Sequence, residues 1–192
     1  IDTGYGMGDL RSYVESLTEK PYFVIVSHGH IDHVDGAGLF DEVYMNPKDV
    51  DLYMNEYSIE RRKAYFEEYK SWSDWCQDYK MSDFNCYRTK PFLPLNDGDR
   101  FDLGDLHLTA VEVPGHTEGM TMVLIEEDRI MFYGDGCTKH TFMFTNGAQS
   151  ISAYLKGLEH LKEFDSRYDM VIRSHNTYSQ PKEVLDEVIA LC

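Results

Sequence analysis

The stretch "SHGHIDH", Ser27 to His33, places three histidines and one aspartate within six positions. It directly follows the apolar run "YFVIV", which predicts a strand over residues 22–27. Imidazoles and carboxylates are costly to bury unless each has a partner. An isolated HxH pair is often accidental, whereas the full HxHxDH string is rare. The density of these groups at one strand end therefore indicates a metal site.

Three later apolar segments end in the same kinds of side chain. They are His116 after residues 106–113, Asp135 after 129–133 and His175 after 170–173. Imidazole and carboxylate ligands together suit Zn²⁺, Mn²⁺ or Fe better than Ca²⁺ or Mg²⁺. The candidate ligands are too many for one tetrahedral site. We therefore expect two metal ions, bridged by Asp135 because a carboxylate has two oxygens.

Composition limits the classes of partner. The chain has 192 residues, 42% of them hydrophobic, which suits a single globular domain over residues 1–192. Its 18 basic and 34 acidic residues give a net charge of −16, so nucleic acid and anionic membranes are not expected partners. The apolar runs are far shorter than the roughly 20 residues of a membrane span. The cysteines lack regular spacing, so reduced thiols and a cytoplasmic location are expected.

Strands and helices alternate along most of the sequence. Helices are predicted from Leu10 to Leu17, after Ser150 and after Pro181, and the main strands are 22–27, 42–45, 106–113, 120–126, 129–133 and 170–173. Residues 48–88 instead form a helical, aromatic-rich insertion. Its aromatic side chains either pack on the helices and the rest of the domain or also line a pocket as a lid.

The four strand-end motifs resemble those of the metallo-β-lactamase superfamily. They read "SHGHIDH", "PGHTEG", "YGDG" and "RSH" in this order, and "IDTG" at the start matches a motif that precedes HxHxDH in that family. The resemblance extends from Ile1 to His175. It implies an α/β (α+β) fold, a four-layer αββα sandwich of two mixed sheets with the metals at one edge.

The resemblance also implies a role for each candidate ligand. The first metal would be held by His28, His30 and His116, the second by Asp32, His33 and His175, and Asp135 would bridge the two. Asp2 would not bind metal but would fix the histidine loop by hydrogen bonds.

The chain departs from the family pattern at its start and in its middle. The family fold normally begins with several strands before the "IDTG" position, and these first N-terminal strands are absent here. We therefore expect the natural protein to continue beyond both ends, or this chain to form a homo-oligomer through an incomplete sheet edge. The interval between His33 and His116 is longer than a minimal member needs, and the insertion accounts for the difference.

The expected activity is hydrolysis of a small ester, thioester or lactone, with a hydroxide bridging two metal ions, most simply Zn²⁺, as the nucleophile. Asp32 is the candidate catalytic residue because it can orient that hydroxide or move its proton. Alternatives are a small-molecule phosphodiesterase, a zinc β-lactamase, and a non-catalytic metal-binding module or inactive fragment. Lys139, His140 and Tyr178 follow ligands closely and are candidates for substrate contact, although each also suits an exposed loop.

Overall fold

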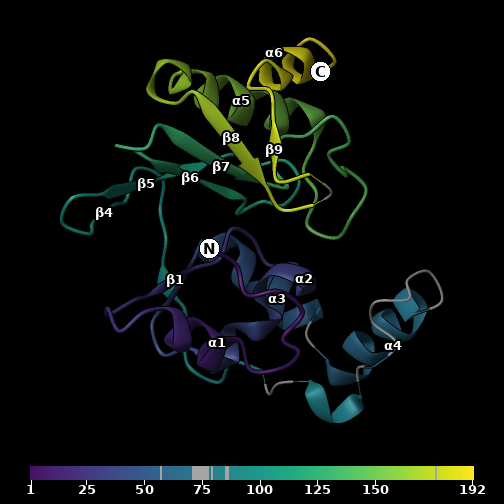
Figure 1. The fold of residues 1–192 in the computed structure, drawn as a ribbon. Coiled ribbons are helices and arrows are strands. Elements are labelled where there is room, and N and C mark those ends of the chain that lie inside the picture. The colour runs from purple at the N-terminus through teal and green to yellow at the C-terminus, as the bar shows by residue number, and fades with distance from the viewer. Residues whose placement is uncertain (57, 71–77, 79, 85–86, 176) are drawn as a thin grey trace. The chain divides into compact units, whose positions relative to one another are not determined.

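The computed structural model describes residues 1–56, 58–70, 78, 80–84, 87–175 and 177–192. The chain forms two compact units (Figure 1). The first contains Ile1–Met45 and Val50–Leu93, and the second contains Asn46–Asp49 and Pro94–Cys192. Within the described residues, no helix has the length and apolar character needed to cross a bilayer.

The first unit combines short strands with several helices. The helices are α1 (Leu10–Leu17), α2 (Ile31–Val34), α3 (Val50–Glu56) and α4 (Ile59–Lys70), with 3-10 turns η1 (Asp35–Leu39) and η4 (Met81–Asp83). The strands are β1 (Val24–Ile25), β2 (Val43–Met45) and β3 (Leu93–Pro94), in the order β1-β2-β3. The predicted strand 22–27 is reduced to β1, because β2, its parallel partner, is only three residues long.

A small apolar core supports this sheet. It contains Val24, Val26, Val34, Ala37, Phe40, Val43, Met45 and Tyr53, all buried. The buried Arg88 closes one side of the core by donating to the backbone oxygens of Ala37, Phe40, Asp41 and Pro91. These bonds join the backbone around η1 to the segment before β3.

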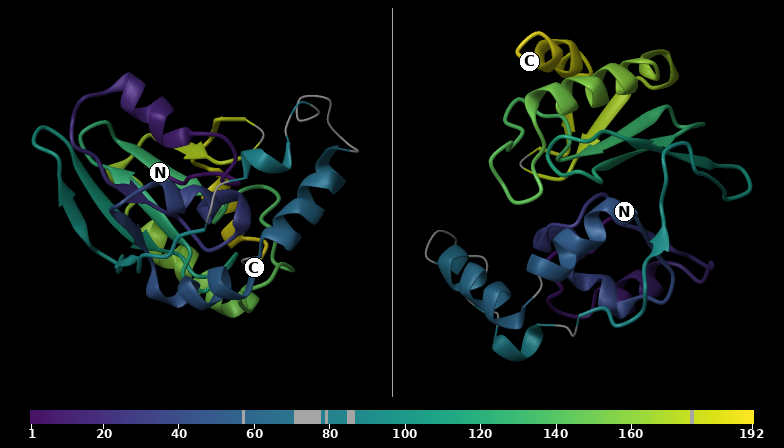
Figure 2. Two further views of the ribbon diagram at one scale, coloured as in Figure 1. Left: turned by 90° about the horizontal axis from the view of Figure 1, so that it is seen from below. Right: turned by 180° about the vertical axis from the view of Figure 1, so that it is seen from behind.

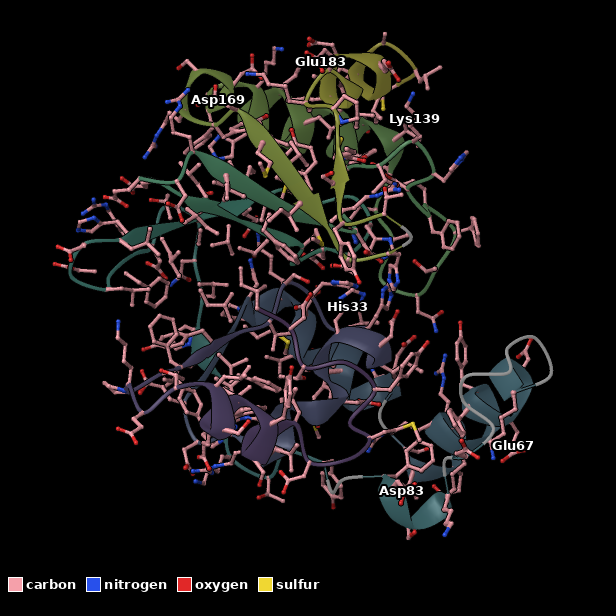
Figure 3. The ribbon with its side chains drawn as sticks, viewed as in Figure 1. His33, Glu67, Asp83, Lys139, Asp169 and Glu183 are labelled. Carbon is pink, nitrogen blue, oxygen red and sulfur yellow. The ribbon has the colours of Figure 1, made fainter. Side chains whose placement is uncertain are left out.

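Most of the described residues of the 48–88 segment lie in α3, α4 and η4. Several of its aromatic side chains pack against other rings: the ring of Tyr53 lies 5.3 Å from that of Phe92, and the ring of Phe66 lies 5.6 Å from that of Phe84. In η4, Asp83 (Figure 3) accepts a hydrogen bond from the backbone of Lys80 at 2.7 Å. Other aromatic residues of the predicted lid, and two cysteines, lie outside the described residues: Tyr57, Trp72, Trp75, Tyr79, Cys76 and Cys86.

The second unit is built on a six-stranded sheet in the order β4-β5-β6-β7-β8-β9. Its strands are β4 (Arg100–Asp102), β5 (His107–Glu112), β6 (Thr121–Ile125), β7 (Ile130–Gly134), β8 (Met170–Arg173) and β9 (Ser179–Gln180). The helical elements are η2 (Pro47–Asp49), α5 (Ile151–Lys162), η5 (Asp165–Arg167) and α6 (Val184–Ile189). All neighbouring strands are antiparallel except β7 and β8, which run parallel.

Helices α5 and α6 lie on the same side of this sheet (Figure 2). Buried residues of both helices and of four strands form one core, which includes Val111, Leu124, Met131, Leu158 and Val171. Helix α5 begins as predicted, because the Ser150 hydroxyl accepts a hydrogen bond from the backbone of Ala153. The parallel pairing of β7 with β8 brings the C-terminal ends of both strands to one edge of the sheet, where Asp135 and His175 follow them.

Candidate metal centre

In the first unit the histidine loop leads from β1 into the helical turn α2. His28, His30 and His33 are buried, while Asp32 is partly exposed. The His28 ring centre lies 4.8 Å from that of His30 and 4.1 Å from that of His33. The carboxylate of Asp32 lies 3.5 Å from His33 Nε2. The four predicted ligands of this stretch are thus brought together by one short segment.

Asp2, near the start of the chain, contacts this loop through its carboxylate. Its carboxylate accepts hydrogen bonds from the Ser27 backbone at 2.7 Å and the Ser27 hydroxyl at 3.0 Å, and it lies 2.9 Å from His33 Nδ1. The Ser27 hydroxyl in turn lies 2.9 Å from His28 Nδ1. Asp2 has a φ of 61°, a left-handed conformation that aspartate tolerates better than most residues. These contacts join Asp2 to the histidine loop, and its role in supporting a bound metal stays a prediction.

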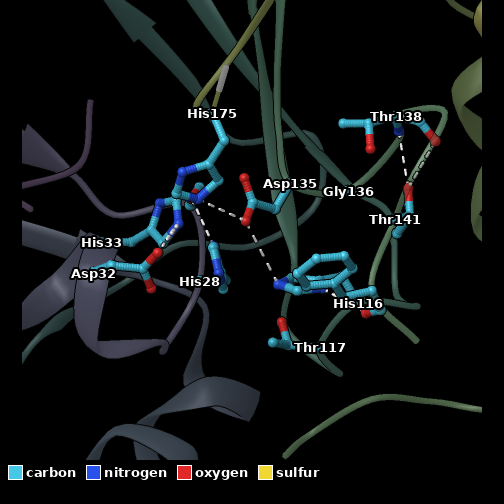
Figure 4. Close-up of polar contacts among 12 residues, drawn as sticks. His28, Asp32, His33, His116, Thr117, Asp135, Gly136, Thr138, Thr141 and His175 are labelled. Atoms are coloured by element: carbon cyan, nitrogen blue, oxygen red, sulfur yellow. Dashed lines mark hydrogen bonds and ion pairs between the residues drawn. The ribbon is translucent and has the colours of Figure 1, made fainter. Parts of the chain in front are cut away.

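In the second unit the Asp135 carboxylate lies between two histidines (Figure 4). Asp135 Oδ2 is 3.1 Å from His175 Nε2 and 3.8 Å from His116 Nε2. Asp135 follows β7 at a register shift in its pairing with β8, and His175 follows β8. His116 is buried, whereas His175 is about half exposed. Three separate strand ends thus bring the three remaining predicted ligands together within this unit.

The position of His116 depends on tight packing of the β5–β6 loop against α5. The preceding residue must be Gly115, because a Cβ there would lie 2.1 Å from the ring of Tyr154. His116 Nδ1 lies 2.8 Å from the Phe142 carbonyl oxygen. After His116, the buried Asp49 accepts hydrogen bonds from the Thr117 hydroxyl at 2.7 Å and from the Gly119 backbone at 2.6 Å.

The donor atoms fit a transition-metal site. A carbonyl oxygen can only accept, so the Phe142 carbonyl requires a proton on His116 Nδ1 and leaves the Nε2 lone pair as the ligand atom. The carboxylate of Asp2 favours the same state at His33. Metal-binding histidines usually have their second nitrogen held by a carboxylate or backbone carbonyl in this way. Nitrogen and carboxylate donors together suit zinc-type ions.

Cys137, two positions after Asp135, is not part of this donor set. Burial raises the pKa of its thiol to about 12, so the thiol stays protonated at neutral pH. The Cys137 carbonyl accepts a hydrogen bond from the Gln180 side chain, which ties the loop to β9. The residue is a packed, free thiol, as is typical of a buried cysteine.

The predicted substrate-side residues are exposed on the second unit. Lys139 (Figure 3) forms an ion pair with Glu187 at 3.3 Å, and the His140 backbone donates to the Thr138 hydroxyl. The Thr138 backbone is bonded in turn to the Thr141 hydroxyl (Figure 4). The Tyr178 side chain is 89% exposed. Their contact with a substrate remains a prediction.

Two groups that orient His116 were not predicted from the sequence. Asp49 contacts Thr117 and Gly119, which lie about 70 positions further along the chain. Its only local signal is the preceding "NP" dipeptide, which indicates a turn. The Phe142 group is a backbone carbonyl, which every residue type carries, so no sequence pattern could have indicated it.

The pattern that defines the metallo-β-lactamase superfamily matches residues 1–171. The chain belongs to this superfamily. Acyl-coenzyme A thioesterase MBLAC2 from Homo sapiens is 25% identical over 93% of the chain, which spans 69% of that protein. Glyoxylase B2 of Dictyostelium discoideum is 27% identical over 66% of the chain and 39% of its own length. The predicted family and the predicted enzyme class, a metallo-β-lactamase-fold hydrolase, are confirmed.

Solved structures show the same fold. A metallo-β-lactamase from Pontibacter korlensis superimposes on the whole chain with a TM-score of 0.70 and 16% sequence identity, over 80% of its own length. A metallo-β-lactamase family protein from Thermus thermophilus gives a TM-score of 0.67 with 17% identity, over 99% of the chain and 69% of that protein. These likenesses confirm the predicted metallo-β-lactamase fold class.

Proposed function

We propose that the two sets of ligands form one dinuclear metal centre and that the chain is a metal-dependent thioester or ester hydrolase. One ion would be held by His28, His30 and His116, the other by Asp32, His33 and His175, with Asp135 shared between them. Membership of the metallo-β-lactamase superfamily supports this assignment. Zn²⁺ is the first choice of metal because the donors are imidazoles and carboxylates.

Divalent ions bound there would polarise a carbonyl oxygen and lower the pKa of water to about 7. The chain's own residues supply orientation and proton transfer. Asp32 is partly exposed, so its carboxylate can accept a proton from the attacking water and return it to the departing thiol or alcohol. Water and the thioester would give a carboxylic acid and a thiol, without any serine or cysteine nucleophile.

A thioester is the preferred substrate class for two reasons. The similar human protein is named as an acyl-coenzyme A thioesterase. In addition, two exposed phenylalanines lie in the loop whose Phe142 carbonyl contacts His116 Nδ1. Phe142 and Phe144 are 53% and 82% exposed, and their ring centres lie 5.1 Å apart. Two exposed aromatic rings on this loop would offer an apolar contact for an acyl chain.

The net charge of −16 refines this substrate class. Coenzyme A carries several phosphate charges, which an acidic protein repels at low ionic strength. An acyl thioester of a short, uncharged thiol avoids this repulsion. We therefore propose a small neutral thioester, with acyl-coenzyme A as the charged alternative to compare at low and high salt.

The observation that carries the proposal is the contact of Nδ1 of His116 and of His33 with an acceptor oxygen. In each unit a histidine has Nδ1 bound to a fixed acceptor and Nε2 left beside an acidic side chain. This arrangement presents Nε2 to a metal and explains why the chain buries so many imidazoles.

The test combines metal content with a substrate panel. Zinc per chain is measured on the purified protein, and hydrolysis is followed with an acyl-N-acetylcysteamine, an acyl-coenzyme A, p-nitrophenyl acetate and bis-p-nitrophenyl phosphate. The proposal predicts bound zinc, thioester turnover, and loss of both in His30→Ala. Turnover of only the phosphodiester would overturn the substrate class, and full thioester turnover by metal-free His30→Ala would overturn the mechanism.

A further inference from the structure

Arg62 of α4 is a fully buried arginine that contacts the segment after the histidine loop. Its Nε lies 2.8 Å from Asp35 Oδ2, and both side chains are 0% exposed. Its Nη2 donates to the backbone oxygens of Tyr5 at 2.7 Å and Gly6 at 3.0 Å. A single guanidinium thus joins α4 to two other segments of the first unit.

Both of these segments hold His33. Asp35 follows α2 directly, two positions after His33. The N-terminal segment carries Thr3, whose backbone and hydroxyl both donate to the His33 carbonyl, at 2.7 and 2.9 Å. The same segment carries Asp2, which contacts His33 Nδ1. Arg62 therefore contacts both of the segments that hold His33, a predicted metal ligand.

Gly6 shows how closely these parts pack. Its φ is +64°, and a Cβ there would lie 2.4 Å from both Arg62 Nη2 and the Asp35 carbonyl oxygen. Only glycine fits this conformation and this approach. A shift of α4 would have to move the N-terminal segment or the end of α2, because no slack is left between them.

We propose that Arg62 is a positioning residue that couples α4 to the histidine loop and so raises the affinity of that loop for metal. The inference rests on the metal centre proposed above. A role in stability alone explains the residue poorly, because a buried ion pair is often no more stabilising than apolar side chains of similar volume. The hydrogen bonds to the Tyr5 and Gly6 carbonyls also fix the orientation of these segments relative to α4, which an apolar side chain could not do.

The neighbouring Arg61 provides a matched control. It is on the same helix, but its side chain is 44% exposed and its contact is with Glu56 at 3.3 Å. Zinc affinity of Arg62→Ala and Arg61→Ala is measured by competition with a chromophoric chelator. The Co²⁺ absorption spectrum reports the ligand geometry, and thermal melting of the metal-free proteins reports the fold.

Arg62→Ala should weaken zinc binding about tenfold and should alter the Co²⁺ spectrum. Tenfold is the low end of the range for residues that orient metal ligands without binding the metal. Arg61→Ala should change neither. Arg62→Ala leaves Asp35 buried without its partner and can unfold the unit, so the double variant Arg62→Met with Asp35→Asn is measured in parallel. The double variant should fold and still bind zinc more weakly, because the contacts to Tyr5 and Gly6 are lost.

A folded Arg62 variant with the zinc affinity and Co²⁺ spectrum of the unchanged protein would overturn the positioning role. His30→Ala separates this failure from a failure of the metal centre itself. If zinc binding survives in His30→Ala as well, the proposed centre is wrong, and the inference falls with it. If His30→Ala loses zinc while the folded Arg62 variants keep it, only the role of Arg62 is wrong.

Discussion

In the first unit four candidate ligands come from seven consecutive residues, Ser27–His33, whereas in the second unit three come from three separate strand ends. The first set is oriented by side chains, mainly Asp2 and Ser27. The second set is oriented by the Phe142 carbonyl and by Asp49, which fixes the loop after His116.

The two sets of ligands should respond differently to the loss of a supporting contact. In the first set Asp2 contacts His33 directly and His28 through Ser27, so losing Asp2 should disturb two histidines together. A set built on a six-stranded sheet has independent supports, so losing one contact leaves the other strand ends in place. Variants at Asp135, Asp2 and Gly115 test this contrast, in decreasing order of expected effect.

Asp135→Ala should have the largest effect. It removes the carboxylate that lies beside both His116 and His175, and these imidazoles then lose their common neighbour. Hydrolysis should fall by more than the ~10–100-fold typical of residues behind metal ligands. Steady-state kinetics and zinc content per chain provide the check. Asp128→Ala, in the turn before β7, is a suitable acidic control, and equal activity of the two variants would contradict the role of Asp135.

Asp2→Ala should weaken zinc binding by about 10–100-fold, because His33 and Ser27 lose the acceptor that orients them. Chelator competition measures this affinity. Asp9→Ala is the control, since Asp9 caps α1 through the backbone of Ser12 and should affect stability but not metal binding. If Asp2→Ala binds zinc as tightly as Asp9→Ala, the histidine loop does not depend on Asp2.

Gly115→Ala should have the smallest effect on metal binding and a clear effect on stability. The added Cβ would overlap the Tyr154 ring, and overpacking of this kind typically lowers the free energy of unfolding by about 1–3 kcal/mol. Urea denaturation measures the change. Tyr154→Leu should relieve the overlap, so the cost of Gly115→Ala should shrink in that background. An unchanged cost would mean that the loop can move away from α5.

Much of this arrangement could be predicted from the sequence, because the ligands follow apolar strands in a specific order. The helical turn α2 was not predicted, since Ile31–Val34 is too short for helical periodicity to appear. The pairing of Arg62 with Asp35 was also not predicted, because the contact joins residues far apart in the chain and a single arginine in a charged helix usually faces solvent. The candidate ligands could be inferred from local sequence motifs, whereas the groups that orient these ligands are brought to them by tertiary contacts.

The most direct test of the central claim is a crystal structure of the zinc-loaded protein with anomalous scattering measured at the zinc edge. A shared dinuclear centre should give two anomalous peaks about 3.5–4 Å apart, as in other two-metal sites, with Asp135 contacting both and His28 and His175 on different ions. A single peak held by the histidine loop alone, or two peaks far apart with separate ligands, would contradict it.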